Sequence, residues 1–185
     1  MAPSATKRRK KKTYCNELLS YEVIDGDTIK ATLDLGYDCY KTVTIRLIGM
    51  DTPELKSSNP LERDAAVLAR AVLVKLMELA WAGQVELESS SLDVYGRPLG
   101  RIFMYKLNLD LARTMQQLKV ARHYSGSNAR NPWKDEDLKV VIKECNKFLQ
   151  DPLPLIKIKE FLAESSYLSD YVSDPRFSGP SGMGC

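Results

Sequence analysis

The first third of the chain alternates between apolar and polar residues, the period that predicts β-strands. Residues 18–35, LLSYEVIDGDTIKATLDL, carry β-branched and aromatic residues on both sides of Asp25-Gly26-Asp27. Aspartate and glycine between two such runs are typical of a hairpin turn. We therefore predict two strands here, with Asp27 at the beginning of the second.

A third strand is predicted at residues 40–48, YKTVTIRLI. Its apolar residues at positions 43, 45 and 47 share one face, because successive side chains of a strand point to opposite faces. Arg46 therefore faces away from this apolar row. The pattern is the one expected of a half-buried strand.

The period then changes to that of a helix. Asn59, Pro60 and Glu62 are typical of a helix start, with asparagine as the N-cap, proline in the first turn and glutamate closing a capping box. The residues that follow are strong helix formers up to Gly83, and they predict one helix of about five turns.

Two more strands and two more helices are predicted in the rest of the chain. Strand-like alternation resumes in QVELES (residues 84–89) and LGRIFMY (residues 99–105). LDLARTMQQLKVA (residues 109–121) predicts a second helix, and a third follows Asn131-Pro132 and ends before Pro152. The apolar stripe of the third helix consists of Leu138, Val141, Ile142, Cys145 and Phe148.

Five strands interrupted by one long helix are the element order of an OB-type barrel. The predicted fold class is α+β, an OB-fold five-stranded barrel with three helices. We expect one domain over residues 17–150, preceded by a basic disordered tail over 1–16. A helical extension over 151–164 and a disordered tail over 165–185 are expected after it.

Basic residues are concentrated near the N-terminus. The chain has 27 Lys and Arg against 24 Asp and Glu, a formal net charge of +3. KRRKKK at residues 7–12 holds 6 of them, which leaves 27 − 6 = 21 basic against 24 acidic residues elsewhere, a net of −3. The body is therefore not a general binder of polyanions. The basic run has three readings: a nuclear-import signal, a nucleic-acid-binding arm or a solvated disordered terminus.

The distribution of apolar residues along the chain also predicts where the protein resides. No apolar run approaches the roughly 20 residues that cross a bilayer, and the first dozen residues lack the apolar stretch of a secretory signal. We expect an intracellular monomer, cytoplasmic or nuclear, with no membrane partner and not secreted.

Three carboxylates are expected at one mouth of the barrel. Asp27 begins the second strand, while Asp51 and Glu54 follow the third, so neighbouring strands can bring them together. Clustered carboxylates repel one another and usually indicate a bound cation or a shifted pKa. No histidine or cysteine is nearby in sequence, so the ligands favour a hard cation, Ca²⁺ or Mg²⁺, over zinc or copper.

Two arginines complete the pattern. Arg46 and Arg97 offer planar, paired donors that match phosphate oxygens and stay charged at any working pH. Together with a cation and a spare carboxylate they predict hydrolysis of a phosphodiester. Each motif taken alone has a simpler reading as a turn or a helix cap.

The segments VIDGDTIK, IRLIGMDTPE and DVYGRPLGRI, in this order, resemble the motifs of the staphylococcal nuclease-like (thermonuclease) family. The resemblance covers roughly residues 19–148. It implies a five-stranded OB-type barrel with three helices and a Ca²⁺-dependent nuclease. The family's typical reaction cleaves DNA and RNA with little sugar specificity and leaves 3′-phosphates.

The resemblance also implies the metal ligands. Asp27 and Asp51 would be the side-chain ligands of Ca²⁺, and the backbone carbonyl of Thr52 would be a third. Mg²⁺ is expected to be a weaker substitute.

The catalytic roles follow from the same resemblance. Glu54 matches the carboxylate that activates or orients the attacking water. Arg46 and Arg97 match the arginines that hold the phosphate and stabilise the developing negative charge.

Two tyrosines match residues beside the family's nucleotide site. Tyr95 and Tyr124 would bind substrate by hydrogen bonding to phosphate or stacking on a base, or would instead close the barrel edge. Val94 and Arg122 depart from the family pattern, which has a lysine and a second tyrosine at these positions. These departures concern nucleotide affinity and substrate preference.

The sequence leaves more than one class of function open. The complete set of acidic and arginine positions favours an enzyme acting on a DNA or RNA substrate. The alternative is a catalytically silent module that binds nucleic acid or protein on the same barrel. A purely structural interaction domain, with the basic run as an address, is a third reading.

Overall fold

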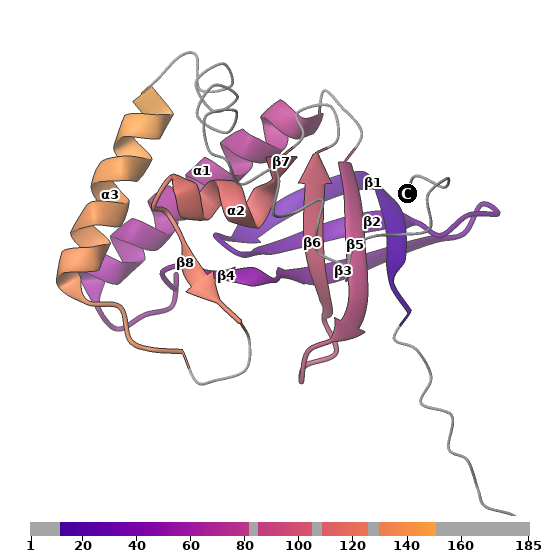
Figure 1. The fold of residues 1–185 in the computed structure, drawn as a ribbon, viewed down its shortest axis with the longest axis horizontal. Coiled ribbons are helices and arrows are strands. Elements are labelled where there is room, and N and C mark those ends of the chain that lie inside the picture. The colour runs from indigo at the N-terminus through magenta and orange to yellow at the C-terminus, as the bar shows by residue number, and fades with distance from the viewer. Residues whose placement is uncertain (1–11, 82–84, 105–108, 126–129, 151–185) are drawn as a thin grey trace, which may run out of the picture.

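The computed structural model describes residues 12–81, 85–104, 109–125 and 130–150 (Figure 1). The elements are, in chain order, β1 (Tyr14–Asp25), β2 (Thr28–Asp34), β3 (Tyr40–Leu47), β4 (Gly49–Asp51), α1 (Pro60–Trp81), β5 (Val85–Leu92), β6 (Pro98–Met104), β7 (Leu109–Asp110), α2 (Leu111–Gln117), β8 (Arg122–Tyr124) and α3 (Asp135–Gln150). The first strand begins at Tyr14, before the expected domain start at residue 17. Residues 7–11 of the basic run and everything expected after residue 150 lie outside the described residues.

Five strands close into a mixed barrel, and three helices pack around it (Figure 1). The strand order is β3-β2-β1-β5-β6, with antiparallel neighbours, and a parallel pairing between β3 and β6 closes the circle. This is the OB-fold-like α+β architecture that the element order predicts. Two short additions, β7 on the edge of β6 and the pair β4–β8, were not predicted from sequence, because two or three residues carry too little alternation.

A glycine allows the barrel to close. Gly100 on β6 pairs with Leu47 on β3, and its position lies against the side chains of Leu87 and Ile45. A Cβ atom at residue 100 would lie 2.9 Å from Ile45 Cγ2 and closer still to Leu87 Cδ1. Only a residue without a side chain lets β5, β6 and β3 approach this closely.

The third strand is more deeply buried at its end than a half-buried strand should be. Ile45 and Leu47 point into the core as predicted, and Arg46 faces the other way. Arg46 is nevertheless buried, because the β1–β2 turn and β4 cover that face. The alternating pattern predicts the direction of Arg46 but not its environment.

The capping box predicted for α1 is only partly correct. Asn59 caps the helix, since its Oδ1 accepts a hydrogen bond from the Leu61 N–H at 2.9 Å. Glu62 does not close the box onto Asn59. Its carboxylate accepts instead from Ser57 Oγ at 2.6 Å and from the Glu54 N–H at 3.3 Å, and Ser57 Oγ accepts from the Asn59 N–H at 3.1 Å. The first turn of α1 thereby anchors the segment that carries Glu54.

The second helix is shorter than predicted. Asp110 is its N-cap and accepts from the Arg113 N–H, so the chain before it is the strand β7 rather than helix. At the other end Lys119 adopts φ +57°, a left-handed conformation that ends α2. The predicted range of residues 109–121 therefore contains a strand, a helix and a turn.

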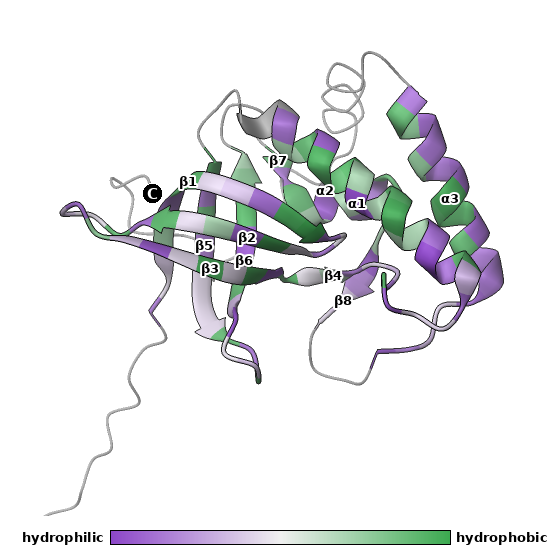
Figure 2. Cartoon of the chain, turned by 180° about the vertical axis from the view of Figure 1, so that it is seen from behind, coloured by the Kyte–Doolittle hydropathy of each residue, from purple (hydrophilic) through white to green (hydrophobic). Residues whose placement is uncertain are grey.

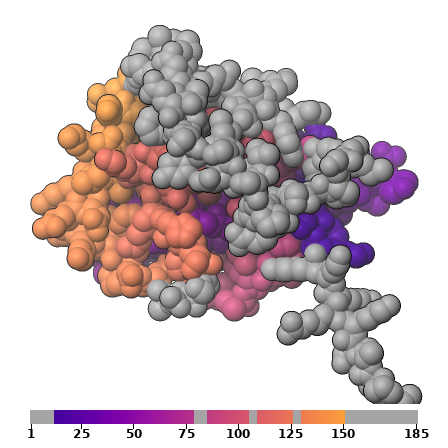
Figure 3. All heavy atoms as spheres, in the orientation of Figure 1, coloured from indigo at the N-terminus to yellow at the C-terminus, as the bar shows by residue number. Residues whose placement is uncertain are grey.

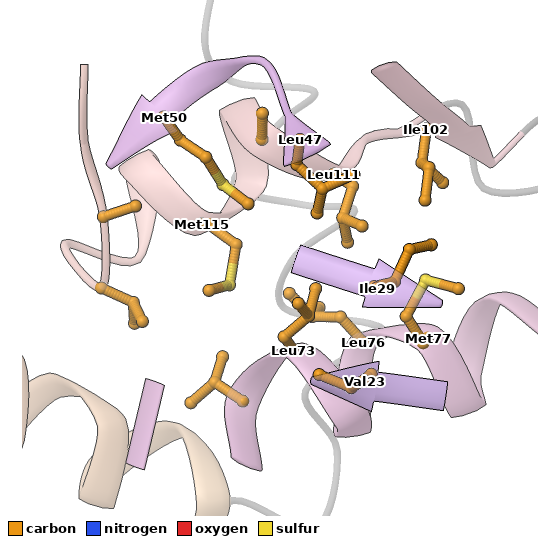
Figure 4. Packing of buried hydrophobic residues seen from close by; sticks show 14 of the residues in the cluster. Val23, Ile29, Leu47, Met50, Leu73, Leu76, Met77, Ile102, Leu111 and Met115 are labelled. Carbon is orange, nitrogen blue, oxygen red and sulfur yellow. The ribbon is translucent and has the colours of Figure 1, made fainter. Parts of the chain in front are cut away.

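The core lies between the barrel and the helices. The predicted stripe of α3 is confirmed: Leu138, Val141, Cys145 and Phe148 are buried, and Ile142 packs against the cluster. Apolar and polar positions alternate around α1 and α3 (Figure 2). Figure 4 shows side chains from several elements meeting in this core: Val23, Ile29, Leu47, Met50, Leu73, Leu76, Met77, Ile102, Leu111 and Met115. Each such side chain contributes about 1.5–3 kcal/mol through burial.

None of the described helices is long and apolar enough to cross a membrane.

Candidate functional site

The β1–β2 turn lies directly against the segment that follows β4. The Asp27 carbonyl accepts a hydrogen bond from the Leu47 N–H at 2.8 Å, which ties the turn to the end of β3. Gly26 packs on Thr52, and a Cβ at residue 26 would lie 2.7 Å from Thr52 Oγ1. The glycine of the turn is therefore required for the two segments to touch, and it brings Asp27 beside Asp51.

Arg46 lies between these two aspartates. It sits opposite Thr28 in the β2–β3 ladder, and its Nη1 forms an ion pair with Asp27 Oδ2. Its Nη2 donates to the Met50 carbonyl at 3.4 Å and lies 4.0 Å from Asp51 Oδ1. Thr28 Oγ1 donates to the other Asp27 oxygen at 2.9 Å. Both side chains of the Arg46–Asp27 pair are more than nine-tenths buried.

Burial lowers the pKa of Arg46 but leaves its side chain positively charged at neutral pH. Removal of the guanidinium from water lowers its pKa to about 10, and the positive charges of Arg130 and Arg97 act in the same direction. Asp51 and Asp25 partly offset this decrease. Arg46 remains protonated at neutral pH and can stabilise negative charge there.

Two buried carboxylate oxygens at this point lack a hydrogen bond. Asp27 Oδ2 and Asp51 Oδ1 have no partner of acceptable geometry, and Thr52 Oγ1 beside them also has none. Arginine nitrogens do lie close to both oxygens, so the contacts are ion pairs by proximity rather than directed hydrogen bonds. Buried acceptors of this kind are costly and rare in native proteins. Carboxylate oxygens without hydrogen bonds, on two aspartates that both lie near Arg46, fit the ligand set of a hard cation.

The donor set has two carboxylates at its centre. No group of three or more His, Cys, Asp and Glu side chains within the described ranges is arranged to hold a metal. The resemblance assigns Asp27, Asp51 and the Thr52 carbonyl to a cation, and in this site only the two aspartates would be its side-chain ligands.

Asp25 belongs to this cluster, although the sequence suggested only a turn role for it. Its Oδ1 accepts from the Gly26 N–H at 2.7 Å. Partial burial raises the pKa of the Asp25 carboxyl, while this hydrogen bond and the charges of Arg46, Arg130 and Arg70 act to lower it. The Asp25-Gly26-Asp27 motif could have indicated this role, since only Gly26 separates its two carboxylates in sequence.

Glu54 lies at the rim of the cluster. It follows the buried Pro53, and its own side chain is 48% exposed. Its backbone N–H donates to Glu62, as described above, and its Oε1 forms an ion pair with Arg130 Nη1. Glu54 is therefore fixed at its backbone and accessible to water at its carboxylate.

Arg97 and Tyr95 occupy the hairpin between β5 and β6. Asp93 organises this turn, because its Oδ1 accepts from the backbone N–H groups of Tyr95 and Arg97 at 2.9 and 2.8 Å, and its Oδ2 accepts from Arg97 Nε at 2.7 Å. The Arg97 guanidinium lies 5.6 Å from the ring centroid of the exposed Tyr95. Among the described residues Arg97 forms no ion pair with the acids of the cluster, but its charge is near enough to lower the pKa of Arg46.

Arg122 is held rigidly against Asp51. The two residues are opposite one another in the β4–β8 ladder, and Arg122 donates from Nε and Nη2 to Asp51 Oδ2 at 2.8 and 2.7 Å. The same guanidinium donates to the Asn131 and Pro132 carbonyls and stacks on Trp133, 4.2 Å from the ring centroid. Arg122 thus occupies Asp51 Oδ2, and the other oxygen, Oδ1, lies near Arg130 and Arg46.

A further arginine, Arg130, reaches the site from the chain that leads into α3. Its Nε lies 3.3 Å from Asp51 Oδ1, and its Nη1 contacts Glu54. Its guanidinium also lies 5.8 Å from the ring of Tyr124 on β8, which places that predicted tyrosine at the edge of the cluster. Nothing in the local sequence around Arg130 indicated this role. β8 and the start of α3 form part of the surface seen in Figure 3.

The comparisons with known proteins add no family to this description. A scan against protein-family models gave no match. A search of the curated proteins gave no match either. The candidate site therefore rests on this chain's own residues and on the motifs that they form.

Proposed function

We propose that this protein is a Ca²⁺-dependent nuclease of the staphylococcal nuclease-like type, which hydrolyses the phosphodiesters of DNA and RNA and leaves 3′-phosphates. One observation carries the proposal. Asp27 and Asp51, on separate segments, each carry a buried oxygen without a hydrogen bond, and both side chains lie beside the buried Arg46. The arginines near these oxygens offset their charge without a directed hydrogen bond, and a hard cation would coordinate such oxygens directly.

Each residue of the cluster has a distinct task in this reaction. A bound divalent cation would supply Lewis-acid stabilisation of charge on the phosphate. Arg46 is fixed by Asp27 and the Met50 carbonyl, so it can present a preorganised positive charge to a phosphate oxygen. Arg97 is fixed by Asp93 and would contact the phosphate from the opposite hairpin.

Glu54 is suited to accept the proton of the attacking water. Its carboxylate is exposed at the rim of the cluster, and its backbone is fixed by Glu62. A general base must reach both water and substrate, and the buried Asp27 and Asp51 do not meet that condition.

The competing function is a binding module without catalysis. It is favoured by the pairing of Asp51, which contacts Arg122 and Arg130 as well as Arg46. Those contacts offset the charge of Asp51 and would weaken a cation site. The Asp51 oxygen that lacks a hydrogen bond and the half-exposed Glu54 carboxylate favour the enzyme, because a binding module requires neither.

Digestion of single-stranded DNA and RNA tests the proposal. Wild-type protein is incubated with Ca²⁺ or with a chelator, and the product ends are mapped. We expect cleavage with Ca²⁺ only, and Glu54→Gln should lose about 10²- to 10⁴-fold in rate because general-base catalysis is worth that much. Glu78→Gln, at an exposed position on α1, is the matched control and should keep the wild-type rate. Equal, negligible digestion by folded protein with and without Ca²⁺ would contradict the proposal and support the binding module.

A further inference from the structure

The two arginines that reach the site from β8 and the following chain are held differently. Arg122 donates a hydrogen bond to Asp51 Oδ2 and forms an ion pair with the same oxygen, donates to two backbone carbonyls and stacks on Trp133. Arg130 forms an ion pair with Asp51, donates a hydrogen bond to Glu54 and lies 5.8 Å from the ring centroid of Tyr124. Among the described residues, the contacts of Arg122 include backbone carbonyls, whereas those of Arg130 are to two carboxylates and one aromatic ring. Arg130 is therefore the one that a competing charge can displace.

Both partners of Arg130 are groups that the proposed nuclease needs. Its Nε lies 3.3 Å from Asp51 Oδ1, the buried oxygen that has no hydrogen bond. Its Nη1 lies against the Glu54 carboxylate, the proposed base. A cation held by Asp27 and Asp51 would neutralise Asp51 and repel the guanidinium, so the same event would free Arg130 and uncover Glu54.

The charge of the ion-paired cluster then becomes positive. Asp27, Asp51 and Glu54 carry three negative charges, and Arg46, Arg122 and Arg130 carry three positive charges, a net of 0. A divalent cation brings the sum to 0 + 2 = +2. A displaced guanidinium at the rim of such a site is paired best by an anion, and phosphate accepts its planar, paired donors.

We propose that Arg130 is an additional phosphate-binding residue, which Asp51 and Glu54 hold until a divalent cation binds and which then contacts a phosphate of the substrate strand next to the one that is cleaved. This inference rests on the proposed nuclease function. Arg130 would then weaken cation binding and strengthen binding of the nucleic-acid strand. Substitution of Arg130 should therefore strengthen cation binding and weaken strand binding, a combination that a purely structural arginine would not produce.

The test measures cation binding and strand binding separately in the full chain. Calorimetric titration with Ca²⁺ alone, without substrate, compares wild type, Arg130→Gln and Arg130→Lys. Binding of a fluorescent single-stranded oligonucleotide in Ca²⁺ is then measured over a range of salt in the slow Glu54→Gln background. Lys75→Gln, which removes one positive charge from the exposed face of α1, is the matched control.

Arg130→Gln should bind Ca²⁺ several-fold more tightly, because one repelling charge is removed. The same variant should bind the oligonucleotide about tenfold more weakly, and the slope of log K against log salt should fall by about 0.7, the value for one phosphate of a single strand. Arg130→Lys keeps the charge, so its Ca²⁺ affinity should stay near wild type. Lys75→Gln should change neither quantity.

The possible results distinguish the role of Arg130 from the proposed nuclease function. If wild type binds Ca²⁺ and cleaves DNA while folded Arg130→Gln matches it in both affinities, the role of Arg130 is wrong and the nuclease stands. Weaker Ca²⁺ binding by Arg130→Gln would also overturn the role. If wild type neither binds Ca²⁺ nor cleaves, both fail together.

Discussion

At the scale of single residues, Arg46 connects the stability of the barrel to the chemistry of the site. Its charge is buried between Asp27 and Asp51, so the pair contributes little net stability in itself. Removing only one partner is different, because a buried charge is then left without compensation.

A double-mutant cycle tests this coupling. Arg46→Met should lower the free energy of unfolding by about 3–5 kcal/mol, because it leaves Asp27 buried and unpaired. Combining it with Asp27→Asn should recover part of that loss, because neither charge remains. Urea unfolding of the four proteins measures the coupling, and strictly additive effects would show that the ion pair is unimportant.

Gly26 also stabilises this region, through close packing rather than through charge. Gly26→Ala should reduce stability by about 1–3 kcal/mol, because its Cβ would overlap Thr52 and push apart the segments that carry Asp27 and Asp51. Thr52→Ala removes Oγ1 and Cγ2 of the crowded side chain, so the double variant should be more stable than Gly26→Ala alone. Thermal unfolding is the measurement, and an unchanged midpoint for Gly26→Ala would contradict the close packing.

Residue roles could be predicted from sequence only where a motif carried them. Asp27, Asp51 and Glu54 stand in recognisable segments, and the structure brings them together. The helices α1 and α2 and several strands lie between Asp51 and Arg130 in the chain, and no local sequence pattern links the two residues. Long-range pairing of this kind is visible only after folding.

At the scale of elements, the β5–β6 hairpin shows how a turn positions the Arg97 side chain. Asp93 accepts hydrogen bonds from two backbone N–H groups and from the Arg97 side chain. Although slight burial acts to raise it, the net result of these bonds and the Arg97 charge is a lowered pKa for Asp93. The turn and the orientation of Arg97 thus depend on an ionised Asp93.

This dependence predicts a pH effect with a defined sign. The pKa of Asp93 is lower in the folded state than its ordinary value of 3.8, so its contribution to stability is present above that value and is lost as pH falls below it. Asp93→Asn should therefore be less stable than wild type near pH 6, and the difference should shrink below about pH 3.8. Chemical unfolding at several pH values measures it. A difference that grows as the pH falls would show the opposite linkage.

Long elements were predictable and short ones were not. The stripe of α3 and the alternation of β2 and β3 repeat often enough to identify both elements. The end of α2 depends on the left-handed backbone of Lys119, and β4 and β8 exist because they pair with one another. The predicted box at Glu62 failed because Ser57 and the Glu54 backbone compete for the same carboxylate.

At the scale of the whole molecule, closure of the barrel creates the site. The parallel pairing of β3 with β6 brings the end of β3, with Arg46, beside the strand that follows the Arg97 hairpin. The order of elements predicts this architecture, since few topologies accommodate five strands that are interrupted in sequence by one long helix. It does not predict how far the arginines of β8 and the following chain reach into the acidic cluster.

Ca²⁺ titration of wild type and Asp27→Asn shows whether Asp27 and Asp51 form a cation site. Calorimetry on both proteins, each shown to be folded, should reveal a Ca²⁺ site in wild type and binding at least about tenfold weaker in the variant, because one charged ligand is lost. Equal Ca²⁺ affinity in the two proteins, or no binding to wild type, would contradict the account.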